Sequence, residues 1–286
     1  MRRTLFILIL VCPIYTYSQP NCNVYKMNDD QPCYEACVTA TESEAGQGTK
    51  SSQMQFDKAI ELCPAFDHAY FEKAVPYLKR GDFVTWRNLM DKAVELNPTQ
   101  HLGYRGWCRY QFLRDYRGAI RDLEKLDSLL EYDIGYSING DYHLNIAKAL
   151  CYKAIGQKSK AITIIENQLA QEGYTPMPYD YLHLGVLKME TGDADGAIEY
   201  LKKSITLNDY LAEPYYYLGL IYKEHNLTKD FRANMEKANT YYLKGYKRFD
   251  PYTHPMDKIY LSDIERELDI CNSNADSIRS SKDRGI

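Results

Sequence analysis

Apolar residues recur along most of the chain with a helical spacing, and the same pattern returns several times. Each of four segments opens on a turn and a short polar run, continues with Ala-Ile or an equivalent pair, and adds an apolar residue four positions later. These segments are 81–98, 114–130, 156–169 and 192–208, and the apolar segments that precede them are 69–80, 103–114, 144–155 and 179–191. Apolar positions three and four residues apart line one face of an α-helix. The pattern therefore predicts an all-α chain in which a helix, a turn and a second helix recur.

The distance between equivalent positions is nearly constant. The residues that open the second helix of each unit are Ser52, Trp86, Ala119, Ala161, Ala197 and Phe231. Successive members are 34, 33, 42, 36 and 34 positions apart. The tetratricopeptide repeat has a period of about 34 residues, with Leu-Gly in its first helix and Ala…Pro near the end of its second. Leu-Gly occurs at 184–185 and 218–219, and the terminal motif occurs as "AIELCP" (59–64) and "AVELNP" (93–98).

The chain thus resembles the tetratricopeptide-repeat family over most of its length. The resemblance implies a right-handed α-solenoid of about six repeats over residues 33–245, followed by a C-terminal part, 246–286, with a polar-faced capping helix at 250–270 and a flexible tail. The expected repeats are 33–66, 67–100, 101–133, 142–177, 178–211 and 212–245, and the first of them lacks a clean first helix. It also implies that many of the 27 tyrosines are wedged between paired helices, and that Gly185 and Gly219 let the two helices approach closely.

The first residues are typical of a secretory signal. A basic "MRR" precedes an apolar run at 5–15, which is too short to span a bilayer. We expect cleavage near Ser18/Gln19, an N-terminal segment at 19–32, and export to a periplasmic, cell-surface or secreted location. A lipid anchor at Cys12 is the rival interpretation, and Val11 and Pro13 argue against it. The chain contains no second long apolar segment, so we expect no membrane span.

Without Cys12 of the expected signal sequence, the chain has seven cysteines. Four of them fall within residues 22–63, where the repeat pattern is weakest. An exported protein can keep disulfides, and a terminal repeat that packs on only one neighbour would gain from them. In antiparallel helices the start of the first lies near the end of the second, which favours Cys33 with Cys63 and leaves Cys22 to pair with Cys37. A four-thiolate zinc site is the alternative, although the spacings match no common zinc motif.

Composition and motifs argue against several function classes. The formal net charge of -4 lacks the basic excess on which nucleic-acid binders depend, so no nucleic-acid partner is expected. The sequence has no phosphate-binding loop, no HExxH and no GxSxG motif. We therefore expect no catalytic, cofactor-binding or metal-binding residues and no cofactor, with an enzyme that lacks a recognisable motif as a third alternative.

The expected function is the binding of a protein or peptide on the concave face, which in this family the first helix of each repeat lines. An alternative function is that of a component of a cell-envelope assembly or transport complex. A lipid anchor at Cys12 would favour this alternative. Arg105 and Arg109 share one helical face and suit a carboxylate, which belongs either to a partner or to a neighbouring acid of this chain. The candidate partner-binding residues are Arg105, Arg109, Tyr136, His143, Ile146, Lys153, Tyr179, Leu182 and Tyr216.

The long step of 42 residues marks an insertion, "IGYSINGD", at 134–141. Asn139-Gly140 predicts a turn, and insertions in repeat proteins form loops on one edge. Tyr136 and Ile138 would be apolar residues on this loop. The loop therefore either packs over its own repeat or meets a partner.

Overall fold

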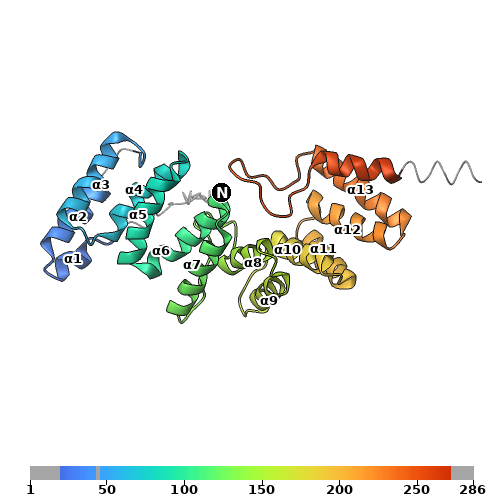
Figure 1. Cartoon of the computed structure of the whole chain (residues 1–286), viewed down its shortest axis with the longest axis horizontal. Helices are drawn as coiled ribbons and strands as arrows, with labels where there is room; N and C mark the ends of the chain where they lie inside the picture. Colours follow the sequence, from blue (N-terminus) through green and yellow to red (C-terminus); the bar gives the residue numbers. More distant parts are fainter. Residues whose placement is uncertain (1–19, 43–45, 272–286) are drawn as a thin grey trace, which may run out of the picture. The chain divides into compact units, whose positions relative to one another are not determined.

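Regular secondary structure in the described part of the chain is helical, apart from one isolated β-bridge between Tyr136 and His143. The computed structural model describes residues 20–42 and 46–271 (Figure 1). The expected signal sequence with its cleavage position, the lipidation candidate Cys12 and the expected tail after residue 271 lie outside these residues. The chain divides into two units, Met1–His101 and Leu102–Ile286.

Consecutive helices of the first unit pack in pairs. Its elements are α1 (Asn23–Met27), α2 (Gln31–Thr41), α3 (Lys50–Leu62), α4 (Asp67–Lys79), α5 (Phe83–Leu96) and the beginning of α6 (Pro98–Cys108). The side chains of Asp30, Thr49 and Asp82 accept hydrogen bonds from backbone N–H groups in the first turns of α2, α3 and α5. Such caps satisfy donors that a helix leaves unpaired. Helix α2 packs on α3 and α4 on α5, so α2 supplies the first helix that the sequence left unclear.

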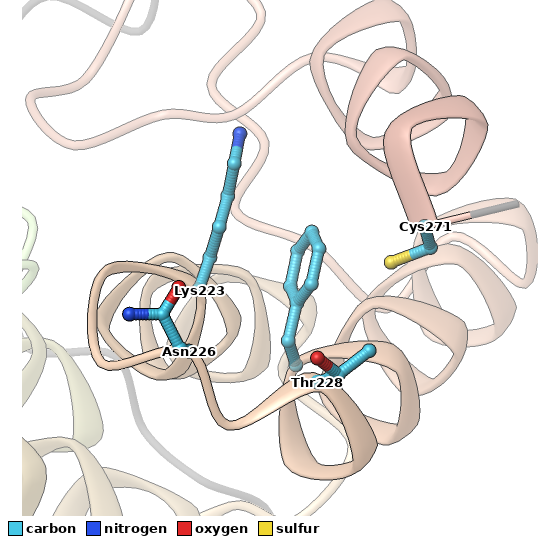
Figure 2. Close-up of a pocket in the computed structure, with 5 residues that line it drawn as sticks. Lys223, Asn226, Thr228 and Cys271 are labelled. Atoms are coloured by element: carbon cyan, nitrogen blue, oxygen red, sulfur yellow. The ribbon is translucent and has the colours of Figure 1, made fainter. Parts of the chain in front are cut away.

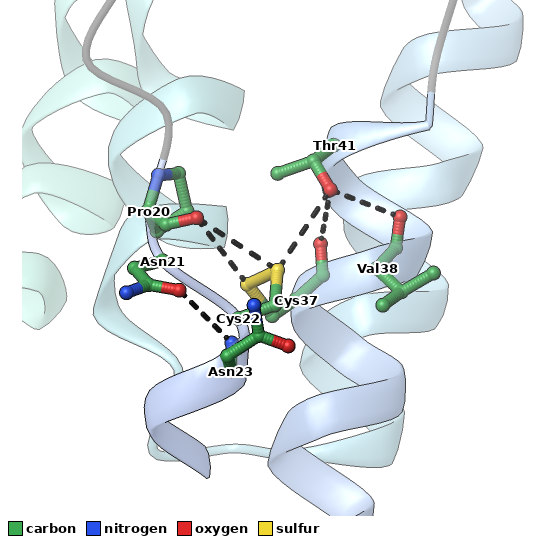
Figure 3. The surroundings of a disulfide bond; sticks show 7 residues. All are labelled: Pro20, Asn21, Cys22, Asn23, Cys37, Val38 and Thr41. Atoms are coloured by element: carbon green, nitrogen blue, oxygen red, sulfur yellow. Dashed lines mark hydrogen bonds between the residues drawn. A yellow bond between two sulfur atoms is a disulfide. The ribbon is translucent and has the colours of Figure 1, made fainter. Parts of the chain in front are cut away.

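Two disulfides tie α2 to its neighbours in the first unit. Cys33, near the start of α2, is bonded to Cys63, the residue after α3. Cys22 is bonded to Cys37, and Figure 3 shows this bond between the chain before α1 and the middle of α2. This is the pairing that antiparallel helices predict, and it leaves none of the four thiols to bind zinc.

Helix pairs continue through the second unit. Its elements are the rest of α6, the π-helix η1 (Arg109–Leu113), α7 (Tyr116–Leu129), α8 (Leu144–Ala154), α9 (Lys158–Leu169), α10 (Pro178–Glu190), α11 (Ala194–Leu207), α12 (Ala212–Glu224) and α13 (Thr228–Leu243). Helices α8 and α9, α10 and α11, and α12 and α13 pack as pairs. A Cβ on Gly185 would lie only 2.7 Å from Leu201 Cγ, so this glycine permits the close approach of α10 and α11. The arrangement confirms the expected all-α helix–turn–helix architecture.

The chain after α13 differs from the expected helix at 250–270. Only residues 261–271 are helical, and residues 246–260, which we call the strap, contain no helix. Pro251 and Pro255 explain the difference, because proline lacks the N–H donor of a helix and disfavours helical geometry in the residue before it. The capping helix therefore begins at residue 261, eleven positions after the expected start at residue 250.

The helix at 261–271 covers the last repeat, as expected of a capping helix. Ile264 and Cys271 lie in one apolar cluster with Phe231 and Met235 of α13. Ile259, at the end of the strap, belongs to the same cluster. The strap is therefore fixed at both ends, by α13 and by the capping helix.

Candidate functional site

The strap lies against the first helices of successive repeats in the second unit. In Figure 1 it is the long loop that leaves the end of α13 and returns to the last described helix. Its tip reaches η1, where the side-chain amide of Gln111 donates to Asp250 at 2.5 Å and to the Thr253 hydroxyl at 2.9 Å. Next to this contact, Arg114 donates to the carbonyl oxygen of His254 at 2.9 Å. The strap thus occupies the face on which the sequence places a partner.

Arg248 anchors the outgoing arm of the strap. Its guanidinium lies between two tyrosine rings, 4.5 Å from the centroid of Tyr142 and 4.4 Å from that of Tyr179. Desolvated cation–π contacts of this kind each contribute about 2 kcal/mol. The same guanidinium lies 3.0 Å from Nε2 of His183, and the backbone N–H of Arg248 donates to Glu213 at 2.7 Å. These contacts come from the loop before α8, from α10 and from α12.

Asp257 anchors the returning arm. One carboxylate oxygen lies 2.6 Å from Nδ1 of His183, and the other lies 2.5 Å from Nζ of Lys153. Lys153 also pairs with Glu190 at 3.0 Å. The carbonyl oxygen of Asp257 accepts a hydrogen bond from the hydroxyl of Tyr217. The carboxylate is therefore held by α8 and α10, and the backbone beside it by α12.

His183 joins the two arms. Its side chain is fully buried, and burial lowers its pKa to about 4, although Asp257 acts in the opposite direction. In a neutral ring with its proton on Nδ1, that nitrogen donates to Asp257 and Nε2 accepts from Arg248. Burial would raise the pKa of Asp257, but Lys153 and His183 outweigh it and hold the value at about 2. At neutral pH the site therefore consists of an arginine cation, a neutral histidine, an aspartate anion and a lysine cation.

The insertion at 134–141 positions one wall of this site. It folds as a short hairpin in which Ser137 N–H donates to Tyr142 O and Leu144 N–H donates to Gly135 O, each at 2.8 Å. The hairpin leads into Tyr142, which is buried and stacks on His183 with a centroid distance of 5.8 Å. Ile138 at the tip is 72% exposed. The loop therefore packs over its own repeat through its ends and leaves its tip in solvent.

The arginine pair expected to face a partner is instead bound within the chain. Arg105 makes two hydrogen bonds to the Asp122 carboxylate, at 2.9 and 2.7 Å, and Arg109 makes a third at 2.8 Å. Asp122 is buried on α7. The sequence left open whether this pair binds a carboxylate of a partner or of the same chain. In the structure the carboxylate is that of Asp122, which α7, the second helix of the repeat, places opposite the two arginines.

The other candidate residues divide into three groups. Lys153 and Tyr179 contact the strap. Tyr136 is 45% exposed and stacks on Tyr174. The members that are buried and present no surface to a partner are His143, Ile146, Leu182 and Tyr216. Among them, His143 caps the start of α8 and pairs with Asp133 at 2.6 Å.

Sequence reasoning missed the four residues that organise the site, which are Tyr142, His183, Arg248 and Asp257. His183 lies four residues after Tyr179 and so shares its helical face, a signal that was available. Arg248 and Asp257 gave no such signal. They lie in a proline-containing segment without helical periodicity, so no helical face relates them to other residues.

Two hollows lie near the last repeats. One has a volume of about 250 Å³ and is lined by Lys223, Asn226, Thr228, Phe231 and the free thiol Cys271. Figure 2 draws the residues that line it. The other, of about 340 Å³, lies where the strap begins and is lined by Tyr179, Asn208, Tyr210, Leu211, Gly245, Tyr246 and Lys247. Among the described residues, no group of three or more His, Cys, Asp or Glu side chains is placed to hold a metal ion. In the same part of the chain, no helix is long and apolar enough to cross a membrane.

Comparison with known proteins identifies the architecture. The family model "Tetratricopeptide repeat" matches residues 181–210. No curated protein matches the sequence. Among solved structures, PilW, a widely conserved type IV pilus biogenesis factor, is similar with a TM-score of 0.53 and 15% identity, over 78% of this chain and 90% of that chain. YrrB, a TPR protein with an unusual peptide-binding site, gives 0.52 and 17%, over 65% and 91%. PilF of Pseudomonas aeruginosa gives 0.53 and 14%, over 78% and 96%. The likeness at these identities concerns the fold, which is that of tetratricopeptide-repeat structures, and the family model matches one repeat of the chain.

Proposed function

We propose that the protein is an exported scaffold that binds a protein or peptide segment on the face formed by the first helices of its second unit. One observation carries the proposal, namely that this face already holds an extended, non-helical segment through well-formed polar contacts. Arg248 and Asp257 of the strap are each held by side chains from at least two different repeats. A face that holds one extended segment in this way has the chemistry to hold another.

Export is supported by the cysteines. Disulfides persist in oxidising compartments and are rare in the cytosol. Both bonds involve α2, the first helix of the first repeat, and a terminal repeat has only one neighbour to pack on. Determination of the mature N-terminus tests this part of the proposal. A chain that begins at Gln19 is expected, and a chain that retains residues 1–18 inside the cell would contradict it.

The binding proposal is tested by partner capture with matched variants of the full chain. His183→Ala with Tyr179→Ala removes two groups of the proposed face, whereas Arg117→Ala changes an exposed residue of α7 and serves as the control. We expect proteins from a native extract to be captured by wild type and by the control and lost with the double variant. Capture that is the same for all three chains would show that this face is not the binding site.

A further inference from the structure

We infer that the strap is an internal ligand, and that the partner segment that replaces it carries an arginine beside an aspartate or glutamate. The inference rests on the proposed function and specifies its ligand. The strap places Arg248 and Asp257 on the two nitrogens of one imidazole, so the two side chains meet although nine positions separate them. A competing segment therefore needs both charges side by side, on a loop or on successive turns.

The course of the strap is longer than the fold requires. Three residues, 191–193, join α10 to α11, whereas residues 244–260 join α13 to the capping helix. The capping helix packs against α13 itself, so a short turn would bring the chain to the same place. Loops of this length without secondary structure are uncommon in compact domains and usually have a function. The need to connect α13 to the capping helix therefore does not explain why the strap crosses the face formed by α8, α10 and α12, which we call the groove.

The strap is attached by a few charged contacts rather than by a large apolar surface. Phe249 is 74% exposed and Tyr252 is 82% exposed, so two of its aromatic rings point into solvent. The apolar residues of 246–260 that are buried are Pro255 and Ile259, and the carboxylate of Asp257 is buried as well. The attraction within buried ion pairs is largely offset by the cost of removing the charges from water. The strap can therefore open locally without unfolding the helices beneath it.

A groove from which the strap has moved offers two adjacent subsites. The rings of Tyr142 and Tyr179 form a slot for a planar cation, which suits a guanidinium better than an ammonium. Lys153 and the Nδ1–H of His183 form a site for a carboxylate. A ligand with only one of these charges would leave the other subsite desolvated and unpaired. The pair, rather than either charge alone, is therefore what the groove recognises.

The test uses full-length chains and one defined probe, a fluorescent peptide with the sequence of residues 246–260. In the variant Arg248→Ala/Asp257→Ala the strap loses both anchors while the groove keeps all of its residues. We expect this variant to bind the probe at least tenfold more tightly than wild type does. A probe with alanine in place of its own arginine and aspartate should not bind.

The matched control is Phe249→Ala/Tyr252→Ala, which changes two exposed residues of the same strap. It should bind the probe as weakly as wild type. If the double-anchor variant keeps its helical content and still binds no better than the control, the strap is a permanent part of the fold and the inference is wrong.

Hydrogen exchange of the wild-type chain provides a readout that does not depend on a variant. Amides of the strap should exchange at least a hundredfold faster than those of α10. Equal protection in the two segments would overturn the inference. If the released variant captures a partner through His183 and Tyr179 but the probe does not compete, the ligand assignment fails and the proposed function stands. If neither chain captures a partner through these residues, the proposed function fails.

Discussion

Nδ1 of His183 and Oδ2 of Asp257 lie 2.6 Å apart, although 74 positions separate the two residues in the sequence. This contact joins α10 to a segment with no regular structure, and both groups are buried. A histidine that accepts from Arg248 and donates to Asp257 can do so only while it is neutral. The attachment of the strap is therefore sensitive to the charge of one ring.

Acidification should weaken the fold through His183. Its pKa is about 4 in the folded chain against an ordinary 6.5, so the unfolded chain binds more protons between these values. The free energy of unfolding therefore falls as the pH is lowered from about 6.5 to about 4, by at most about 3 kcal/mol. The contribution of Asp257, with its pKa near 2, is lost only below its usual 3.8.

Chemical denaturation across this pH range checks the prediction with His183→Gln. The pKa of His143 and of His68 is also lowered by burial, so a residual slope should remain in the variant. His254→Gln, at an exposed histidine of the strap, should keep the wild-type slope. An identical slope in His183→Gln and wild type would contradict the role assigned to His183.

Asp122 should be essential to the stability of the third repeat. Asp122→Ala leaves Arg105 and Arg109 without the carboxylate that they share, and removal of one partner from a buried ion pair costs about 3–5 kcal/mol. The midpoint of urea unfolding measures this loss. Arg117→Ala, at an exposed residue of the same helix, should stay within about 0.5 kcal/mol of wild type. A loss below about 1 kcal/mol for Asp122→Ala would indicate that solvent, rather than Asp122, solvates the two guanidiniums.

The Cys33–Cys63 disulfide should stabilise the first unit more than Cys22–Cys37 does. The bonds close loops with sequence separations of 30 and 15, and the chain-entropy model assigns the longer loop about 3–4 kcal/mol and the shorter about 3 kcal/mol. Hydrogen exchange of α2 and α3 in Cys33→Ala/Cys63→Ala and in Cys22→Ala/Cys37→Ala measures the difference. A reductant should alter wild type but not a chain that lacks both bonds. Faster exchange in the Cys22 variant than in the Cys33 variant would contradict the order.

Deletion of residues 134–141 should release the strap as well as lower stability. The hairpin positions Tyr142, whose ring covers the Arg248 guanidinium. Without the hairpin this ring is displaced, and Arg248 becomes accessible to trypsin. Cleavage after Arg248 should accelerate about tenfold, and Tyr142→Ala should have the same effect. Ile138→Ala, at the exposed tip, is the control. A deletion variant that melts earlier but resists trypsin like wild type would assign the hairpin to stability alone.

Gly185→Ala should separate α10 from α11. The new Cβ would lie 2.7 Å from Leu201 Cγ and 3.1 Å from its backbone nitrogen, and overpacking of this kind costs about 1–3 kcal/mol. Thermal unfolding followed by circular dichroism measures the loss. Gly46→Ala is the control, because its nearest neighbour would be 3.9 Å away. An unchanged melting temperature for Gly185→Ala would show that the two helices adjust without cost.

The parts that were predictable from sequence are those that depend on neighbours along the chain. The Ala-Ile pairs and Leu184-Gly185 define a helix pair locally, and the same proximity gave the Cys33–Cys63 bond. The strap escaped prediction because Asp257 finds its partners on α8 and α10, far back in the sequence. The polar pattern of residues 250–270 is typical of an exposed helix face. It does not reveal that Asp257 is buried and pairs with Lys153 and His183.

In stacked repeats each unit ordinarily touches only the units before and after it, so unfolding can begin at an end and spread step by step. The strap adds contacts that skip repeats, since one loop touches η1, α8, α10 and α12. While the loop is in place, fraying at the C-terminal end is coupled to the centre of the second unit, and the repeats it touches should unfold in one concerted transition. Departure of the loop would divide that transition into separate steps, so occupancy of the groove sets the cooperativity of the second unit.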